Sequence, residues 1–188
     1  MTTTAPRRAR RHDPDRRERI VAACLDVVGE VGVAGASARR IAAAADVPLG
    51  SVSYHFDSID ALLAEAFERF AREMSDRFEE VMARAEGMDE ARDAVVGLIT
   101  SAVLTDPREH VLTHELYTLA ARDPAYRRLT HAWMARSRDA LERHFDPLTA
   151  RLLDAMIEGL SIHRALDTDP RPAAEVTEAV TRLTAPPS

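Results

Sequence analysis

Residues 37–56 read SARRIAAAADVPLGSVSYHF and predict two short helices joined by a tight turn. Ser37 suits the N-cap of the first helix, because its hydroxyl can accept a hydrogen bond from an otherwise unpaired backbone N–H. Asp46 tolerates the left-handed conformation that such a turn needs. Val52 and Phe56 lie four residues apart, which places both on the inward face of the second helix. The segment therefore predicts a helix-turn-helix.

The rest of the second helix presents small, hydroxyl and aromatic groups with little charge. These residues are Leu49, Gly50, Ser51, Ser53, Tyr54 and His55. In the major groove of DNA, hydroxyls can meet base edges and apolar atoms can meet the thymine methyl. We therefore expect this face to contact DNA.

The same segment resembles the TetR family of transcriptional regulators, over roughly the first third of the chain. The matching positions keep the family's spacing in one unbroken register: Ser37, Ile41, Ala42, Ala45, Val47, Gly50, His55 and Phe56, followed by Ala61, Leu62 and Leu63. Four positions differ, since Asp46 replaces a turn glycine, Pro48 a frequent Ser, Ser53 a usual Tyr and Ile59 a common phosphate-binding Lys. The last two changes shift the expected operator affinity toward arginines elsewhere.

The resemblance implies a homodimeric repressor that reads a palindromic operator in double-stranded DNA and releases it when a small-molecule effector binds. Arg39 matches a base-reading arginine in some of the family and is the expected contact to guanine. Leu49, Gly50, Ser51 and Ser53 are expected to read base edges or methyl groups. Tyr54, His55 and Ser37 are expected to contact phosphates. The resemblance implies no cofactor and no enzymatic activity.

Composition favours an all-α protein of one or two domains. The chain has 188 residues, of which 46% are hydrophobic and 30% charged, with only 7 Gly and few aromatic residues. Cys24 is the only cysteine, which excludes an intramolecular disulfide and a cysteine metal cluster. No apolar run is long enough for a bilayer span or a signal-peptide core, so we expect a cytoplasmic protein without a membrane partner.

The charges are unevenly distributed. The net charge is −6, yet residues 1–60 carry 9 Arg against 8 acidic residues and residues 61–188 carry 16 Arg against 23. Residues 1–12, MTTTAPRRARRH, have no helical periodicity and are predicted to form a flexible basic arm. The arm is expected either to neutralise DNA phosphates or to remain a solvated tail. Arg16, Arg17 and Arg19 are further candidates for phosphate contacts.

Hydrophobic periodicity predicts helices throughout the chain and no strand. Beyond the helix-turn-helix they cover about 15–31, 58–86, 89–105, 108–121, 126–145, 148–166 and 172–183. Expected inward positions include Val31, Ala102, Val103, Val111 and Leu152. Asp-Pro pairs at 106, 123 and 146 mark three of the boundaries.

This pattern predicts the arm at 1–12, a DNA-binding domain at 13–73 and a helical domain for ligand binding and dimerisation at 74–188. In similar proteins the last two long helices, here 148–166 and 172–184, pair with their copies in a second subunit. The other helices would enclose a ligand pocket. Its candidate lining residues combine apolar bulk with a few polar tips: His114, Tyr117, Trp133, Met134, Met156 and His163.

Two other functions stay open from the sequence. His110 and His114 lie four residues apart beside Glu115, a spacing that can hold a metal ion if His131, His144 or His163 supplies a third ligand. A metal-dependent enzyme would need such a site. The chain could also be a helical protein that binds a small molecule or a partner and no longer reads DNA.

Overall fold

The computed structural model describes residues 15–100, 106–169 and 172–185. Within these ranges it contains nine helices and no strand, which confirms the all-α prediction. The helices are α1 (Arg16–Gly35), α2 (Ala38–Ala44), α3 (Leu49–His55), α4 (Ile59–Ala83), α5 (Met88–Thr100), α6 (Pro107–Ala120), α7 (Pro124–Leu141), α8 (Pro147–Leu166) and α9 (Ala173–Leu183). None of the described helices is long and apolar enough to cross a membrane.

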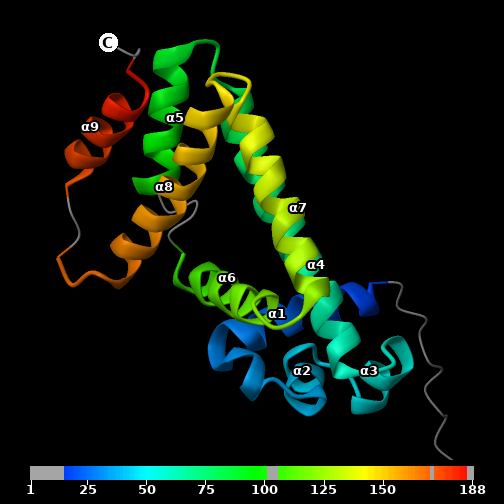
Figure 1. The fold of residues 1–188 in the computed structure, drawn as a ribbon. Coiled ribbons are helices and arrows are strands. Elements are labelled where there is room, and N and C mark those ends of the chain that lie inside the picture. Colours follow the sequence, from blue (N-terminus) through cyan, green and yellow to red (C-terminus); the bar gives the residue numbers. More distant parts are fainter. Residues whose placement is uncertain (1–14, 101–105, 170–171, 186–188) are drawn as a thin grey trace, which may run out of the picture.

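Two groups of helices are joined by the long helix α4. Figure 1 shows α1, α2 and α3 around the first half of α4 at one end, and α5, α8 and α9 at the other. Helix α7 packs along α4, and α6 packs on α1 on one side and on α7 on the other. We call α1–α3 with residues 59–74 the head, and α5–α9 with the rest of α4 the body.

The side chains form two hydrophobic cores that meet along α4. The head core contains Phe67 and Met74 of α4 and extends into α6 through Leu112 and Leu116. The body core begins at Phe78, one turn further along α4. Because α6 contributes to the head core, this division does not decide the predicted domain boundary between residues 73 and 74.

The helix-turn-helix forms where the sequence predicts it. The Ser37 hydroxyl accepts the Arg40 backbone N–H at 3.3 Å and caps α2. Asp46 has φ 51° and makes the left-handed turn before α3. Val52 and Phe56 are buried, with 4% and 6% of their surface exposed. These contacts fix α3 with its polar face outward.

The three Asp-Pro pairs begin helices of the body. The carboxylates of Asp106, Asp123 and Asp146 accept backbone N–H groups in the first turns of α6, α7 and α8. The proline that follows each one needs no N–H partner at the first helical position. Each pair therefore ends one connection and caps the next helix, as Ser58 does for α4.

Some predicted helix ends and inward positions are wrong. Gly32 interrupts α1 with φ 69° and ψ 172°, and Val31 beside it is 42% exposed rather than buried. Helix α7 ends at Leu141, and residues 142–144 form a turn rather than a continuation of the helix. Phe145 is nevertheless buried. The apolar spacing therefore continues beyond the end of α7, and this made the predicted helix too long.

Two further apolar positions are more exposed than predicted. Val111 on α6 is 38% exposed and Leu152 on α8 is 46% exposed. Both helices carry apolar residues on more faces than the two cores cover. Ala102 and Val103 lie outside the described residues.

Candidate functional site

The predicted DNA-contacting residues of α3 all reach the surface. Gly50 and Ser53 are exposed, Ser51 and His55 are half-buried, and Leu49 and Tyr54 are 47% and 83% exposed. Leu49 and Tyr54 therefore project from α3, where a partner surface can contact them. The geometry is compatible with insertion of α3 into a groove.

Helix α2 contributes Arg39 next to this face. Arg39 is exposed, whereas Arg40 donates from Nη1 to the Gly35 carbonyl oxygen at 3.1 Å. Ser37 is exposed as well, but its hydroxyl already caps α2. A hydroxyl has a second acceptor lone pair and its own proton, so capping leaves Ser37 able to donate to a phosphate.

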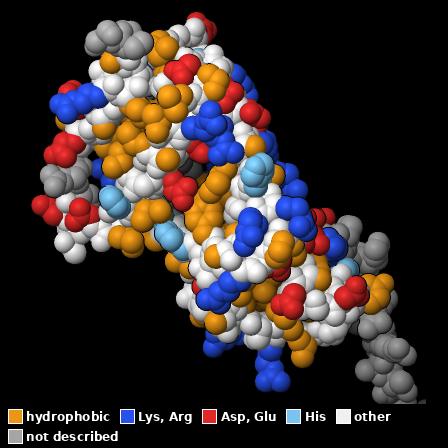
Figure 2. Space-filling view, viewed as in Figure 1, with side chains coloured by type: hydrophobic (Ala, Val, Ile, Leu, Met, Phe, Trp, Pro, Cys, Tyr) orange, Lys and Arg blue, Asp and Glu red, His pale blue; other side chains and the backbone are white. Residues whose placement is uncertain are grey.

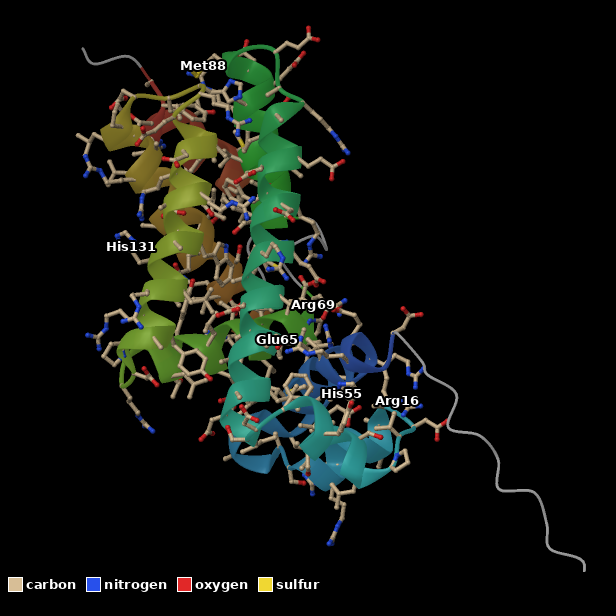
Figure 3. All side chains as sticks on the ribbon, turned by 90° about the vertical axis from the view of Figure 1, so that its right-hand side faces the viewer. Arg16, His55, Glu65, Arg69, Met88 and His131 are labelled. Carbon is tan, nitrogen blue, oxygen red and sulfur yellow. The ribbon has the colours of Figure 1, made fainter. Side chains whose placement is uncertain are left out.

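Arg17 of α1 makes contacts inside the protein that the sequence analysis missed. Its guanidinium forms an ion pair with Glu65 of α4 and lies over the Phe56 ring at 4.8 Å. Figure 3 shows Glu65 and Arg69 on the side of α4 that faces α1, and Arg69 pairs with Glu18 of α1 at 3.4 Å. Arg17 and Glu65 are 48 positions apart, so no local pattern could predict the pair.

Arg side chains project from the surface of the head (Figure 2). Figure 2 shows Arg side chains projecting from the lower end of the molecule, where Figure 1 places α2 and α3. The predicted basic arm, residues 1–12, lies outside the described residues. Asp46 and Asp57, which flank α3, are exposed as well, so the charge of the described surface around α3 is mixed.

A cavity of about 90 Å³ lies in the body between α4, α6, α7 and α8. Its apolar lining includes Met74, Phe78, Trp133, Met134 and Ile157. The Trp133 ring packs near Tyr117, with their centroids 6.2 Å apart. The cavity is therefore walled by aromatic rings and methionines, which suit a planar apolar ligand.

Three of the six predicted pocket residues line this cavity, namely Tyr117, Trp133 and Met134. The structure places the other three elsewhere. His114 lines a separate groove between α6 and the end of α8, and Met156 lies in an open groove beside α9. His163 lines neither this cavity nor either of these two grooves.

Three carboxyl groups that the sequence analysis did not select also line the cavity. They are Glu109 of α6 and Asp154 and Glu158 of α8. Burial and the neighbouring Glu158 raise the pKa of Asp154 to about 6, against the opposing effect of Arg138 at 3.4 Å. Burial also raises the pKa of Glu158, while the Tyr117 hydroxyl acts in the other direction. These carboxyls lie in an environment that disfavours their negative charge.

Several polar atoms at the cavity are buried without a hydrogen-bond partner among the described residues. They are Nε2 of His110, Oε2 of Glu109 and Oγ of Ser161. The other oxygen of Glu109 accepts from Nη2 of Arg77 at 2.6 Å. Unpaired buried polar atoms cost free energy, so they indicate a site where a ligand can supply hydrogen bonds.

The histidines considered as metal ligands do not come together. The rings of His110 and His114 lie 6.2 Å apart, and the Nδ1 of His114 donates to the His110 carbonyl at 2.6 Å. His144 Nε2 lies 3.1 Å from the Met82 carbonyl oxygen, and Figure 3 shows His131 on α7. No group of three potential ligands for a metal exists among the residues that the structure describes.

Helix α8 presents exposed apolar side chains. Leu148 is 62% exposed, Leu152 46% and Leu166 75%. Figure 2 shows hydrophobic side chains across the upper part of the molecule, where Figure 1 places α5, α8 and α9. Exposed leucines at this density are typical of protein–protein contacts.

Comparison with known families matches both parts of the chain. Residues 20–66 match the family described as bacterial regulatory proteins, tetR family. Residues 86–186 match the tetracyclin repressor-like, C-terminal domain. The two matches cover the helix-turn-helix and almost all of the body.

Individual relatives agree over most of their length. SCO7518 from Streptomyces coelicolor A3(2), a candidate transcriptional regulator, is 55% identical in sequence to this chain. The match covers 92% of this chain and 100% of SCO7518, and the two structures superpose with a TM-score of 0.83. The multidrug binding protein EbrR, complexed with imidazole, has 35% identity, coverage of 94% and 98%, and a TM-score of 0.72. The HTH-type transcriptional regulator BetI 1 from Chromohalobacter salexigens is 28% identical over 81% of this chain and 80% of its own.

Proposed function

Because the chain belongs to the TetR family of DNA-binding transcriptional regulators, we propose that it is a repressor that releases its operator when a small organic cation occupies the body cavity. The relatives are regulators rather than enzymes. Family membership also disfavours a helical binding protein that has lost DNA reading. The protein would act in the cytoplasm, where it meets the operator.

In this proposal α3 enters the major groove. Leu49, Gly50, Ser51 and Ser53 read base edges or methyl groups, and Arg39 from α2 makes a bidentate contact to guanine. Tyr54, His55 and Ser37 contact phosphates. The exposure of Tyr54 at 83% and of Leu49 at 47% supports this assignment, because both side chains extend beyond the protein surface.

The proposed operator is palindromic because the repressor is proposed to be a homodimer. One recognition helix reads few base pairs, and two helices related by a dyad read half-sites about 34–36 Å apart. The exposed Leu148 and Leu152 on α8 support pairing through α8 and α9. Burial of such side chains contributes about 25 cal/mol per Å² of apolar surface, and the entropic cost of association opposes this contribution.

The cavity carries the proposal for the effector. Three carboxyls, from Glu109, Asp154 and Glu158, lie among aromatic rings and methionines. An aromatic wall with a carboxylate attracts a planar organic cation through both the ring faces and the charge. EbrR has been crystallised with ethidium, malachite green and proflavin, which supports the same class of ligand here.

Ligand entry must change the body. The cavity holds about 90 Å³, whereas pockets for drug-sized ligands measure about 300–1,000 Å³. A dye therefore fits only if α6, α7 or α8 moves away from the others. Movement of these helices is the proposed link between effector binding and operator release.

The first experiment selects bound sequences from a random pool of double-stranded DNA at near-physiological salt. Enrichment of a palindrome supports the dimeric reader and supplies a labelled operator for anisotropy measurements. Ethidium should then release the operator at concentrations that leave an unrelated repressor on its own operator, a control that is needed because ethidium also intercalates into DNA. If no sequence is enriched, the proposal of sequence reading fails; if the operator stays bound at saturating ethidium, the proposed effector class fails.

Variants test the assigned contacts. Arg39→Ala should cost about 1–3 kcal/mol on the operator and relax one base position. Arg143→Ala, in the turn at the end of the molecule opposite α3, removes the same charge and should bind as the parent does. Replacing the arginines between residues 7 and 11 should weaken all sequences alike and flatten the salt dependence. Equal losses for Arg39→Ala on operator and random DNA would refute base reading.

A further inference from the structure

The charges around the body cavity do not balance when every group is ionised. The carboxyls of Glu109, Asp154 and Glu158 line it, and the guanidiniums of Arg77 and Arg138 pair with Glu109 at 2.6 Å and with Asp154 at 3.4 Å. Glu158 has no guanidinium partner among the described ion pairs. These three carboxylates and two guanidiniums therefore sum to one unbalanced negative charge.

Asp154 and Glu158 form the part of the cluster that can hold a proton. They are four residues apart on α8, so their side chains lie on the same face, one turn apart. The side chain of Asp154 is only 21% exposed. Two adjacent carboxyls in a poorly hydrated cavity resist simultaneous ionisation, because each negative charge raises the cost of the other. A bound proton restores neutrality.

The charged and titratable groups that face this pair come from three other helices. They are Arg138 of α7, Glu109, His110, His114 and Tyr117 of α6, and Arg77 of α4, which is paired with Glu109. Burial and His114 lower the pKa of His110. His110 therefore stays neutral near pH 7 and does not supply the missing positive charge.

An independent feature of the same cavity points to a ligand. Ser161, one turn beyond Glu158 on α8, lines the cavity with only 6% of its surface exposed. Its hydroxyl has no hydrogen-bond partner among the described residues. The site thus combines an excess carboxyl with an unpaired buried hydroxyl.

We propose that an effector cation and a proton compete for the Asp154–Glu158 pair, so that the cation enters the cavity as the proton leaves. This inference rests on the proposed cationic effector and adds how the site is regulated. A monovalent cation replaces the charge of the lost proton and leaves the cluster neutral. Acidification then weakens effector binding, and the repressor holds its operator at low pH even when effector is present.

The size of the coupling follows from the titration of Asp154. With a pKa of about 6, Asp154 is half protonated at pH 6, and a cation that keeps it ionised releases about half a proton there. Near pH 8 almost no proton is released. The dissociation constant should rise about tenfold between pH 8 and pH 5, and more if Glu158 also loses its proton.

The test is isothermal titration calorimetry with ethidium, whose charge does not change with pH. Titrations at pH 6 in two buffers with different ionisation enthalpies measure the protons released per ethidium. Titrations at pH 5 and 8 measure the change in affinity. The double variant Asp154→Asn/Glu158→Gln should lose both the proton release and the pH dependence. Asp139→Asn, an exposed carboxyl on α7, is the matched control and should keep both.

The outcomes separate this inference from the proposed function. Ethidium binding with equal affinity at all three pH values, and without proton release, overturns the exchange but leaves the cationic effector. Proton release that persists in the double variant also overturns it. Absence of ethidium binding at every pH overturns the effector class and this inference together. Circular dichroism of each variant establishes that it is folded.

Discussion

Replacing Arg17 with Ala distinguishes an internal brace from a DNA contact. The structure places the Arg17 guanidinium against Glu65 of α4 and over the ring of Phe56, the residue that ends α3. Arg17 thus joins α1, α4 and the end of the recognition helix. We predict that its main effect on DNA binding comes from holding α3 in place.

The contacts predict a measurable loss of stability. The side chains of Arg17 and Glu65 are 46% and 29% exposed, so their ion pair contributes about 0.2–1 kcal/mol. The cation–π contact with Phe56 adds about 0.5–1 kcal/mol at an exposed site. Arg17→Ala should therefore lower the free energy of unfolding by about 1–2 kcal/mol. A double-mutant cycle with Glu65→Gln isolates the ion pair.

Urea denaturation measures the stability, and operator binding at several salt concentrations measures the number of phosphate contacts. An internal brace predicts that Arg17→Ala weakens operator binding without changing the salt slope. Arg17→Lys is the matched control, because it keeps the charge but loses the planar fork and the stacking. If the slope falls by about 0.9 in Arg17→Ala, returns in Arg17→Lys, and stability does not change, Arg17 contacts a phosphate and the reasoning is wrong.

Two further predictions concern stability. Gly32→Ala should lower the free energy of unfolding by about 1–3 kcal/mol in urea denaturation. The backbone of Gly32, with φ 69° and ψ 172°, adopts a conformation nearly restricted to glycine, and the new methyl group would lie 2.5 Å from Oε1 of Glu115. Gly97→Ala, inside α5 with no atom within 4 Å of the added carbon, should be neutral or stabilising, and equal losses in both variants would contradict the backbone argument. The raised pKa of Asp154, about 6, means that the folded protein binds this proton more tightly than the unfolded chain, so the contribution of Asp154 to the free energy of unfolding should fall by about 2 kcal/mol as pH rises from 4 to 7.5. Asp154→Asn should match the wild type at pH 4 and exceed it at pH 7.5, whereas a difference that does not vary with pH would refute the assignment.

The helix-turn-helix was predictable because its signals are local. The cap at Ser37, the turn at Asp46 and the inward pair Val52 and Phe56 fall within twenty consecutive residues. Each depends on backbone geometry or helical spacing, and each is confirmed. The Asp-Pro boundaries were predictable for the same reason, since an N-cap and a first-turn proline act on adjacent residues.

The cavity could not be predicted in the same way. Asp154 and Glu158 have the sequence pattern of a solvated helix face, and their burial arises only when α6 and α7 pack on α8. The pair of Arg17 with Glu65 likewise depends on contacts between distant segments. Spacing alone also overestimated the burial of Leu152, because α8 has more apolar positions than its core needs.

The position of α6 connects the two proposed activities. Its Leu112 and Leu116 are fully buried in the head core, while its Glu109 and Tyr117 line the body cavity. Arg108, at the start of α6, pairs with Asp26 of α1 at 2.7 Å.

A ligand larger than about 90 Å³ must push α6, α7 or α8 apart. Close-packed cores respond to such pressure by shifting whole helices rather than by deforming. Helix α6 cannot shift without displacing Leu112 and Leu116 against α1, and α1 supports α2 and, through Arg17, the end of α3. We therefore expect effector binding in the cavity to reach the recognition helix through α6 and α1.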